Sequence, residues 1–364
     1  MSSNFGENIK IQIFGQSHSA AIGVVIDGLP AGISIDFDEV NKFMQRRAPG
    51  RNNLSTTRSE SDIPEILSGI KNSKTCGAPL CAVIKNENTR SGDYDNLIDI
   101  PRPSHADYPA FIKYGGANDV SGGGHFSGRL TAPLCFAGAI AKQILEKKGI
   151  TIGAKISKIA KISDNPFDMV NTDKNTVLEV IKKDFPVLCD EKGVEMKNAI
   201  IKAKTSGDSV GGVIECIALG VPVGLGDPMF DGVENRISQI VFGIPAVRGI
   251  EFGAGFSASD MTGSAHNDAY TYAKDGSVRT KTNNHGGVLG GITTGMPIYF
   301  KVAFKPTPSI AKEQASISLK EKEDKNLIIK GRHDPCIVQR AAVCVEAAAA
   351  LAILDLMISA EGRK

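Results

Sequence analysis

One short pattern occurs twice in this chain, and it constrains the fold more than any other feature. Gly28-Leu-Pro-Ala-Gly-Ile33 follows an apolar run and precedes an acidic helix start, and Gly220-Val-Pro-Val-Gly-Leu225 has the same setting. Glycine supplies the left-handed backbone that tight turns need, and proline fixes the residue between. A strand–turn–helix unit that repeats in this way predicts two related halves. We expect one domain over residues 1–364 with a substantial core.

Hydrophobic periodicity predicts several strands and fewer helices around these turns. Ile9, Ile11 and Ile13 alternate with polar residues, as in a strand with one buried face. Similar runs predict strands at 21–27, 80–85, 211–219 and 297–304. Asp36 and Glu39 have the spacing of a capping box, and we expect a helix from there to Arg47. Further helices are predicted at 130–148 and 335–357, the last apolar on nearly every side and therefore buried.

The segment 157–206 differs from the rest of the chain. It is rich in lysine and has none of the glycine and histidine motifs found elsewhere. We therefore expect it to form a peripheral excursion that lies away from the functional site.

Charge and cysteine usage narrow the class of protein. The 42 basic and 40 acidic residues nearly cancel, which gives no general attraction to nucleic acid or to an acidic membrane. The N-terminus lacks the basic and apolar regions of a secretory signal, and Glu346 and Asp355 interrupt the most apolar stretch. Cys76 and Cys81, the closest two of the seven cysteines, lack metal or redox spacing. The sequence predicts a cytoplasmic protein with reduced thiols and no metal.

Histidine is rare and unevenly placed. Five of the six histidines lie in short segments that also contain glycine pairs or arginine: His18, His105, His125, His285 and His333. Glycine lets the backbone approach a ligand, while histidine, arginine and aspartate bind anions and transfer protons. One composite site is the interpretation that unites them, although a lone histidine is more often structural than catalytic.

Each of these segments also has a purely structural interpretation. The glycine run 122–124 could form a phosphate-binding nest or a tight turn. The arginines at 46, 47 and 51 could bind a ligand or interact favourably with the dipole at the C-terminal end of a helix. Residues 283–295 suit recognition of a planar ring or a glycine-rich bulge. Arg332 and Asp334 suit an anion site or a simple helix cap. With neither a P-loop nor a Rossmann motif, the residues alone indicate an enzyme acting on a small polyanion.

Together these segments resemble the signature motifs of the chorismate synthase family. The resemblance covers almost the whole chain apart from 157–206, and the motifs occur in order at suitable spacing: Phe14-Gly-Gln-Ser-His18, Arg46-Arg47-x-Pro-Gly50, Arg102-Pro-Ser-His105-Ala-Asp107, 122–129, 244–253, 283–295, Lys305-Pro-Thr-Pro-Ser309 and Gly331-Arg-His-Asp-Pro-Cys336. Eight ordered motifs make the match highly specific.

The resemblance implies a fold, a reaction and partners. The fold is a β-α-β sandwich of the α+β class, with helices between two antiparallel sheets related by internal pseudo-symmetry. The enzyme is a carbon–oxygen lyase of the shikimate pathway: by anti-1,4-elimination it removes phosphate and the C6 hydrogen from 5-enolpyruvylshikimate-3-phosphate. The product, chorismate, leads to the aromatic amino acids. The family uses reduced FMN and forms homotetramers, without nucleic acid or membrane partners. The sequence leaves open whether NADPH or an external source reduces the flavin.

The motif positions imply residue roles. His18 resembles the acid near the departing phosphate, His105 the histidine that protonates or stabilises the flavin, and Asp334 the carboxylate that relays a proton beside it. Because buried charge must be paired, arginines would hold the substrate's anionic groups: Arg47, Arg102, Arg129 and Arg332. The residues expected to contact the flavin are His125, Phe126, Ser127, Ala246, Gly290, Lys305, Pro306, Thr307, Pro308, Ser309 and Arg332.

Four positions depart from the family pattern. Gln16 replaces a glutamate, Ser19 a glycine and His125 an arginine, and Asn53 stands where many members carry arginine, with Arg51 and Arg58 nearby. These changes bear on affinity more than on the reaction.

Two other classes of protein compete with this interpretation. A flavin- or anion-binding paralogue without activity has no need of three acid–base residues at His18, His105 and Asp334. A nucleic-acid-binding protein would need a basic stripe with aromatic residues, but only 6% of this chain is aromatic and tryptophan is absent.

Overall fold

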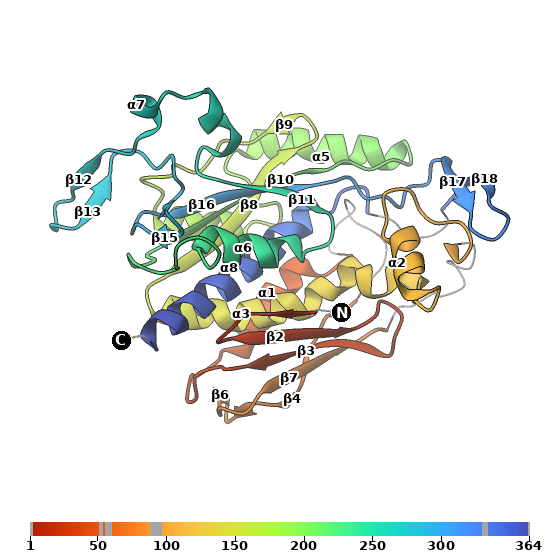
Figure 1. The fold of residues 1–364 in the computed structure, drawn as a ribbon, viewed down its shortest axis with the longest axis horizontal. Helices are drawn as coiled ribbons and strands as arrows, with labels where there is room; N and C mark the ends of the chain where they lie inside the picture. Colours follow the sequence, from red (N-terminus) through yellow and green to blue (C-terminus); the bar gives the residue numbers. More distant parts are fainter. Residues whose placement is uncertain (1–2, 51–53, 55–59, 88–96, 330–333, 363–364) are drawn as a thin grey trace.

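Two antiparallel sheets enclose a layer of helices in the computed structural model, which describes residues 3–50, 54, 60–87, 97–329 and 334–362 (Figure 1). The first sheet has the order β1 (Asn4–Phe5), β2 (Lys10–Gly15), β3 (Ala21–Asp27), β7 (Leu80–Lys85) and β4 (Glu65–Ser68). The second sheet has the order β11 (Val247–Phe252), β16 (Ile298–Phe304), β10 (Gly212–Leu219), β8 (Thr151–Ile159) and β9 (Ile162–Ser163). The predicted β-α-β sandwich is confirmed.

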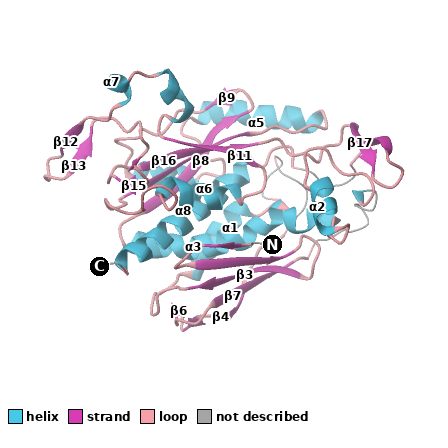
Figure 2. Ribbon diagram, in the orientation of Figure 1, coloured by secondary structure: helices cyan, strands magenta, loops and turns pink. Residues whose placement is uncertain are grey.

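The helices separate into an inner layer and an outer one (Figure 2). The inner helices are α1 (Phe37–Arg47), α3 (Thr131–Lys147), α6 (Val233–Phe242) and α8 (Val338–Glu361). Outside the second sheet lie α4 (Lys174–Lys182) and α5 (Asp190–Thr205), and the short α2 (Asp107–Tyr114) and α7 (Gly263–His266) belong to peripheral loops. Two-stranded ribbons complete the fold: β5 (Ile70–Lys71) with β6 (Lys74–Thr75), β12 (Tyr270–Tyr272) with β13 (Val278–Thr280), β14 (Val288–Leu289) with β15 (Ile292–Thr293), and β17 (Gln314–Ser318) with β18 (Glu323–Leu327).

All the predicted strands and helices are present, but one local detail is wrong. Asp36 caps α1 as expected, because its carboxylate accepts from the backbone N–H groups of Asp38 and Glu39 at 2.9 and 3.1 Å. The second hydrogen bond of a capping box, from the backbone N–H of Asp36 to the Glu39 side chain, is not formed, since Glu39 binds Lys42 instead. The backbone N–H of Asp36 donates to Gln143 of α3 at 2.9 Å, so a tertiary contact replaces the local one.

The two copies of the repeated turn make the same pair of hydrogen bonds. In the first half, Ile33 donates its backbone N–H to Thr75 Oγ1 at 2.9 Å, and that hydroxyl donates to the Pro30 carbonyl at 2.6 Å. In the second half, Leu225 N–H donates to Thr293 Oγ1 at 2.9 Å, and that hydroxyl donates to the Pro222 carbonyl at 2.6 Å. Each turn therefore rests on a buried threonine from a small ribbon that precedes β7 or β16.

Helices α3 and α8 pack closely at the centre of the molecule. A Cβ built on Gly138 would lie 2.2 Å from the Cβ of Ala347, so only glycine permits this approach. The thiols of Cys135 and Cys344, three residues earlier in each helix, lie 3.7 Å apart. Because both contacts step three residues forward in each helix, the two helices run parallel here.

Two buried carboxylates explain how the apolar α8 carries acidic residues. Glu346 accepts from Lys142 at 3.1 Å, from the backbone of Ala154 at 3.2 Å, and from Arg46. Asp355 accepts from the backbone of Ile9 at 2.8 Å and from other N–H groups of the same loop. The helix is long and apolar enough to cross a membrane, but 94% of its most apolar window is buried inside the protein. These contacts are those of a core helix.

The two sheets differ on their outer faces. Strand β2 alternates buried and more exposed residues, so the outer face of the first sheet is open. Strands β8 and β10 have near-continuous buried stretches because α4 and α5 cover the second sheet. Under this cover Lys155 is fully buried, with its ammonium group 3.0 Å from Asp164 and 2.8 Å from Glu215. The segment predicted as an excursion thus begins inside β8 and becomes this outer layer.

Candidate active site

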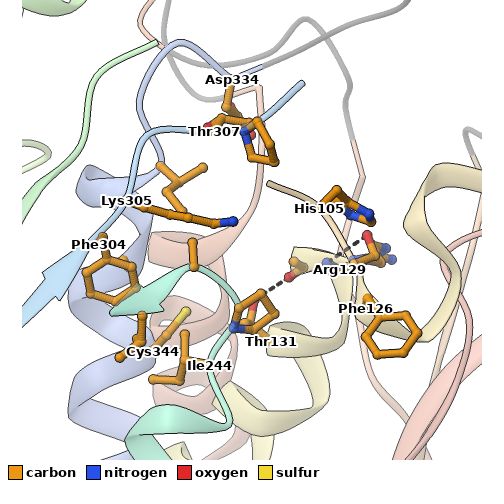
Figure 3. Close-up of a pocket in the computed structure, with 18 of the residues that line it drawn as sticks. His105, Phe126, Arg129, Thr131, Ile244, Phe304, Lys305, Thr307, Asp334 and Cys344 are labelled. Atoms are coloured by element: carbon orange, nitrogen blue, oxygen red, sulfur yellow. Dashed lines mark hydrogen bonds between the residues drawn. The ribbon is translucent and has the colours of Figure 1, made fainter. Parts of the chain in front are cut away.

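A cavity of about 520 Å³ opens where four inner helices end (Figure 3). The C-terminal ends of α1 and α6 and the N-terminal ends of α3 and α8 line it, together with loop residues from 102–106, 122–129, 243–247 and 305–309. Residues from both halves line the cavity: Arg47, Arg102, Ser104, His105, Gly122, His125, Phe126, Ser127, Arg129 and Thr131 from the first half, and Phe242, Ile244, Ala246, Phe304, Lys305, Thr307, Pro308, Ser309, Asp334, Arg340 and Cys344 from the second. None of the described residues between 157 and 206 reaches it.

Two of the predicted substrate arginines share one carboxylate. Arg47, the last residue of α1, and Arg129, just before α3, both donate to Asp62, and all three side chains are buried. Burial alone would raise the pKa of Asp62, but the two guanidinium groups hold it below its usual value. Arg129 also binds Asn86 at 3.1 Å and lies 3.7 Å from Glu60. The guanidinium groups are therefore oriented and charge-balanced before any ligand binds.

A second cluster lies in the loop before α2. Arg102 donates to the carboxylate of Asp107 from Nε at 2.7 Å and from Nη2 at 2.8 Å. His105 Nδ1 lies 2.6 Å from the same carboxylate, and Arg102 also reaches the Ser309 hydroxyl at 3.3 Å. Burial would raise the pKa of Asp107, but hydrogen bonds from Arg102 and His105 hold it far below its usual value. The carboxylate is therefore ionised at neutral pH.

The glycine run 122–124 accommodates His18. All three glycines have positive φ, at 59, 87 and 53°. A Cβ on Gly122 would lie 2.1 Å from the His18 ring, so the run lets the backbone reach this imidazole. His18 itself does not line the cavity, although Gly122 does. These contacts fit the turn interpretation of the run and place His18 directly behind the cavity wall.

His125 is held by the first sheet. Its Nδ1 lies 2.8 Å from the Gly15 carbonyl, and its Nε2 lies 2.8 Å from the Ser3 hydroxyl. Both ring nitrogens thus have protein partners, while the neighbouring Phe126 lines the cavity and is partly exposed. Ser127 accepts from the Arg129 N–H at 3.3 Å and starts the turn that leads into α3. These bonds favour a packing role for His125 over that of a free ligand-binding cation.

The second half supplies a largely apolar wall and one lysine. Ile244 and Phe304 face Arg129 and Thr131 across the cavity, and the Lys305 side chain extends into it. The Lys305 ammonium group donates to the Ser104 carbonyl and so connects the two walls. Burial and the nearby Arg248 lower the pKa of Lys305. This wall has the flat, apolar character that suits a ring system, with a cation at its edge.

Asp334 lies at the upper rim of the cavity in Figure 3 and is paired with Arg340 of α8. Sequence reasoning missed Arg340, although a lone arginine in the first turn of a nearly all-apolar helix is a usable signal. It also missed Asp62, whose polar surroundings in the sequence give no sign of burial. Arg332, like Arg51, Asn53 and Arg58, lies outside the described residues.

Most of the predicted site residues meet in the cavity, but some do not. Gly290, at the β14–β15 turn beside the start of α6, and Pro306, between two lining residues, do not line the cavity. Arg46 turns inward to Glu346 and is structural, whereas Arg47 beside it faces the cavity. The segment 283–295 is held by buried Asn283, whose side chain bonds the carbonyls of Met169 and Pro297 at 3.0 and 2.9 Å.

Comparison with known proteins gives one consistent result. The family model described as chorismate synthase matches residues 9–358. A chorismate synthase of Lancefieldella parvula is 45% identical, over 99% of this chain and 97% of its own length. That of Pyrococcus abyssi is 46% identical, over 97% of each chain. A crystal structure of chorismate synthase superposes with a TM-score of 0.77 at 28% identity, covering 98% of this chain and 94% of that one.

The match spans both sheets, the inner helices and every loop that lines the cavity. Sequence identity, fold and the position of the motif residues therefore agree, and the chain belongs to the chorismate synthase family of lyases.

Proposed function

We propose that the cavity binds 5-enolpyruvylshikimate-3-phosphate with reduced FMN and performs the family reaction there: loss of phosphate and of the C6 hydrogen to give chorismate. The observation that carries the proposal is the convergence of Arg47, Arg102 and Arg129 with His105 and Asp334 on one cavity. A substrate with two carboxylates and a phosphate needs several fixed cations, because an unpaired buried charge is costly.

The arginines act by binding and orienting the substrate. Arg47 and Arg129 are held in place by Asp62, and Arg102 by Asp107, so little side-chain freedom is lost when an anion arrives. Guanidinium groups present parallel N–H donors that match carboxylate and phosphate oxygens. Arg332 is proposed to complete this set.

Three residues are proposed to handle protons. His18, behind the wall formed by Gly122, donates to the departing phosphate, while His105 and Asp334 hold or move protons on the two sides of the cavity. Arg340 keeps Asp334 oriented through their ion pair. Each such group accelerates a reaction by roughly 10²- to 10⁴-fold in general acid–base catalysis.

The second-half wall fits a flavin. The apolar stretch around Ala246, the adjoining loop 305–309 and Phe126 offer flat contacts, with Lys305 to pair an anionic group. The cavity volume of about 520 Å³ lies within the usual range for ligand sites of roughly 300–1,000 Å³. His125, which lines the cavity, and Gly290, which does not, are both proposed as flavin contacts. Reduced FMN, when bound, supplies electron density transiently and helps remove the C6 proton; NADPH and an external reductant are the two alternatives for its reduction.

We further propose one domain, a homotetramer and a cytoplasmic location. Large apolar side chains stand exposed on the second half, among them Val223 at 70%, Phe230 at 79% and Phe256 at 85%. Contacts between subunits would bury such side chains, which supports the proposed assembly only where they form a contiguous patch. All seven cysteines are free, in keeping with a reducing compartment.

An anaerobic assay tests the proposal directly. Purified protein with chemically reduced FMN should convert 5-enolpyruvylshikimate-3-phosphate to chorismate and phosphate, and oxidised FMN should give no turnover. Equal turnover with oxidised FMN, or none with reduced FMN, would reject it. Tight FMN binding without turnover would identify the non-catalytic paralogue instead.

A further inference from the structure

The cluster of charged side chains before α2 indicates a function for Asp107, to which no role has been given above. Asp107 opens α2, and each of its oxygens has two partners in the same loop. Oδ1 accepts from Arg102 Nη2 at 2.8 Å and lies 2.6 Å from His105 Nδ1. Oδ2 accepts from Arg102 Nε at 2.7 Å and from the Arg102 backbone N–H at 3.0 Å.

These contacts determine which nitrogen of His105 carries a proton. An ionised carboxylate only accepts, so His105 must donate from Nδ1 to Asp107. Arg102 Nη2 also lies 3.1 Å from Nδ1, but two donors cannot bond to each other, and both therefore serve the shared Oδ1. In neutral His105 the remaining nitrogen, Nε2, is then the basic one.

The fold keeps Nε2 accessible. This nitrogen faces the glycine run, since a Cβ on Gly123 would lie 3.4 Å from it, an ordinary contact distance. The His105 side chain is 15% exposed and lines the cavity. Nearby charges are Arg102 and Asp107 in its own loop and Lys305, which binds the Ser104 carbonyl from the loop after β16.

We propose that Asp107 is a positioning residue that fixes His105 in the Nδ1–H tautomer and presents Nε2 to the ligand. Arg102 completes the cluster, because its guanidinium holds and charge-balances the Asp107 carboxylate. The inference rests on the proposed proton-transfer role of His105. It adds a carboxylate–histidine pair to the site, in which the carboxylate sets orientation without accepting the proton.

A purely structural role is the competing explanation. Asp107 is the first residue of α2, where a carboxylate favours the helix dipole, and it also anchors the Arg102 backbone. Loss of stability alone would therefore not distinguish the two roles. The test needs measurements on His105 itself.

The first measurement uses the natural protein with 15N-labelled histidine. The His105 resonances should show a protonated Nδ1 and an unprotonated Nε2 above the histidine pKa. The Nε2–H tautomer would overturn the proposal. This result does not depend on turnover, so it is independent of whether the proposed function of His105 holds.

The second measurement compares Asp107→Asn with Asp190→Asn, which removes an exposed first-turn carboxylate from α5. In Asp107→Asn, kcat with reduced FMN should fall by about 10²-fold or more, as when a tautomer-fixing aspartate is neutralised. The fraction of neutral His105 in the Nδ1–H tautomer should also fall, because the ionised acceptor is gone. Asp190→Asn should leave kcat, its pH profile and the His105 tautomer unchanged.

Opposite results would identify a structural residue. An Asp107→Asn protein with kcat reduced only in proportion to its folded fraction, and with the tautomer retained, would overturn the assignment. If His105→Ala itself turns over normally, the proposed function of His105 fails while the tautomer measurement still stands on its own.

Discussion

The two halves share a framework but divide the chemistry between them. Each half runs from a strand through a threonine-braced turn into a helix, β3 to α1 and β10 to α6, and both helices end at the cavity. The first ends in Arg47 and the second in Phe242. Equivalent places in a duplicated fold thus deliver a cation on one side and an apolar wall on the other.

The difference shows how a near-symmetric scaffold builds an asymmetric site. Arginines and His105 gather on the first-half wall, where Asp62 and Asp107 balance them. Among the described residues, the second-half wall carries its charges on Lys305, Asp334 and Arg340 and its hydroxyls on Thr307 and Ser309, and most of the rest is apolar. A bound ligand could place its charged groups against the first-half wall and a flat ring against the second-half wall.

The largest difference expected between the halves concerns their outer faces. Lys155→Met should lower the free energy of unfolding by about 3–5 kcal/mol, because Asp164 and Glu215 would remain buried without their cation. Lys10→Met, on the open face of β2, should change it by less than about 0.5 kcal/mol. Urea unfolding of both variants measures the contrast, and similar values would show that the outer layer does not seal the second sheet.

Removing the proton-transfer groups tests the division of chemistry. His18→Ala and His105→Ala should each lower turnover by about 10²-fold or more while the protein stays folded. His266→Ala, in α7 of the second half, should leave it within about twofold. The measurement is anaerobic turnover with reduced FMN. Near-normal rates in both first-half variants would make these histidines structural.

Neighbouring arginines at the end of α1 separate binding from stability. Arg47→Met should raise KM by roughly 10- to 100-fold, since a substrate anion loses a charged donor. Arg46→Met should leave KM unchanged and lower the midpoint of unfolding, because Glu346 keeps only Lys142 as a cation. Steady-state kinetics and urea unfolding distinguish them, and an equal rise in KM would contradict the assignment of Arg46 to the core.

The smallest effects should be the most alike. Thr75→Val and Thr293→Val each remove the hydroxyl that braces one turn, and each should destabilise the protein by about 1 kcal/mol. Thermal unfolding of the two single variants gives the comparison. Strongly unequal losses would mean that the repeated turns no longer have equivalent structural roles.

Sequence patterns predicted the strands, the helices and the repeated turn better than they predicted the buried ion pairs. The repeated turn, β2 and α1 follow from local periodicity and capping. Strand β8 was missed because Lys155 and Lys158 suggest a solvent-facing segment, and the partners that bury Lys155 lie far along the chain. Long-range pairing of this kind leaves no local signal.

The candidate site shows the same contrast between residues that local motifs predict and ion pairs that they do not. Glycine, histidine and arginine motifs predicted most of the residues lining the cavity. They did not predict that Asp62 would bridge two arginines, or that Arg340 would pair with Asp334. Motifs identify the residues that face a ligand, whereas their counter-charges come from segments without a distinctive composition.

The close crossing at Gly138 has a consequence for the width of the cavity. Thr131 and Cys344 line the cavity at one end of α3 and α8, and the helices touch backbone to side chain at Gly138 and Ala347, about two turns along α3. This contact fixes the distance between the two helix axes at the crossing. The spacing of the helix ends, and with it the breadth of the cavity, is set by a methyl group that is missing from a residue outside the site.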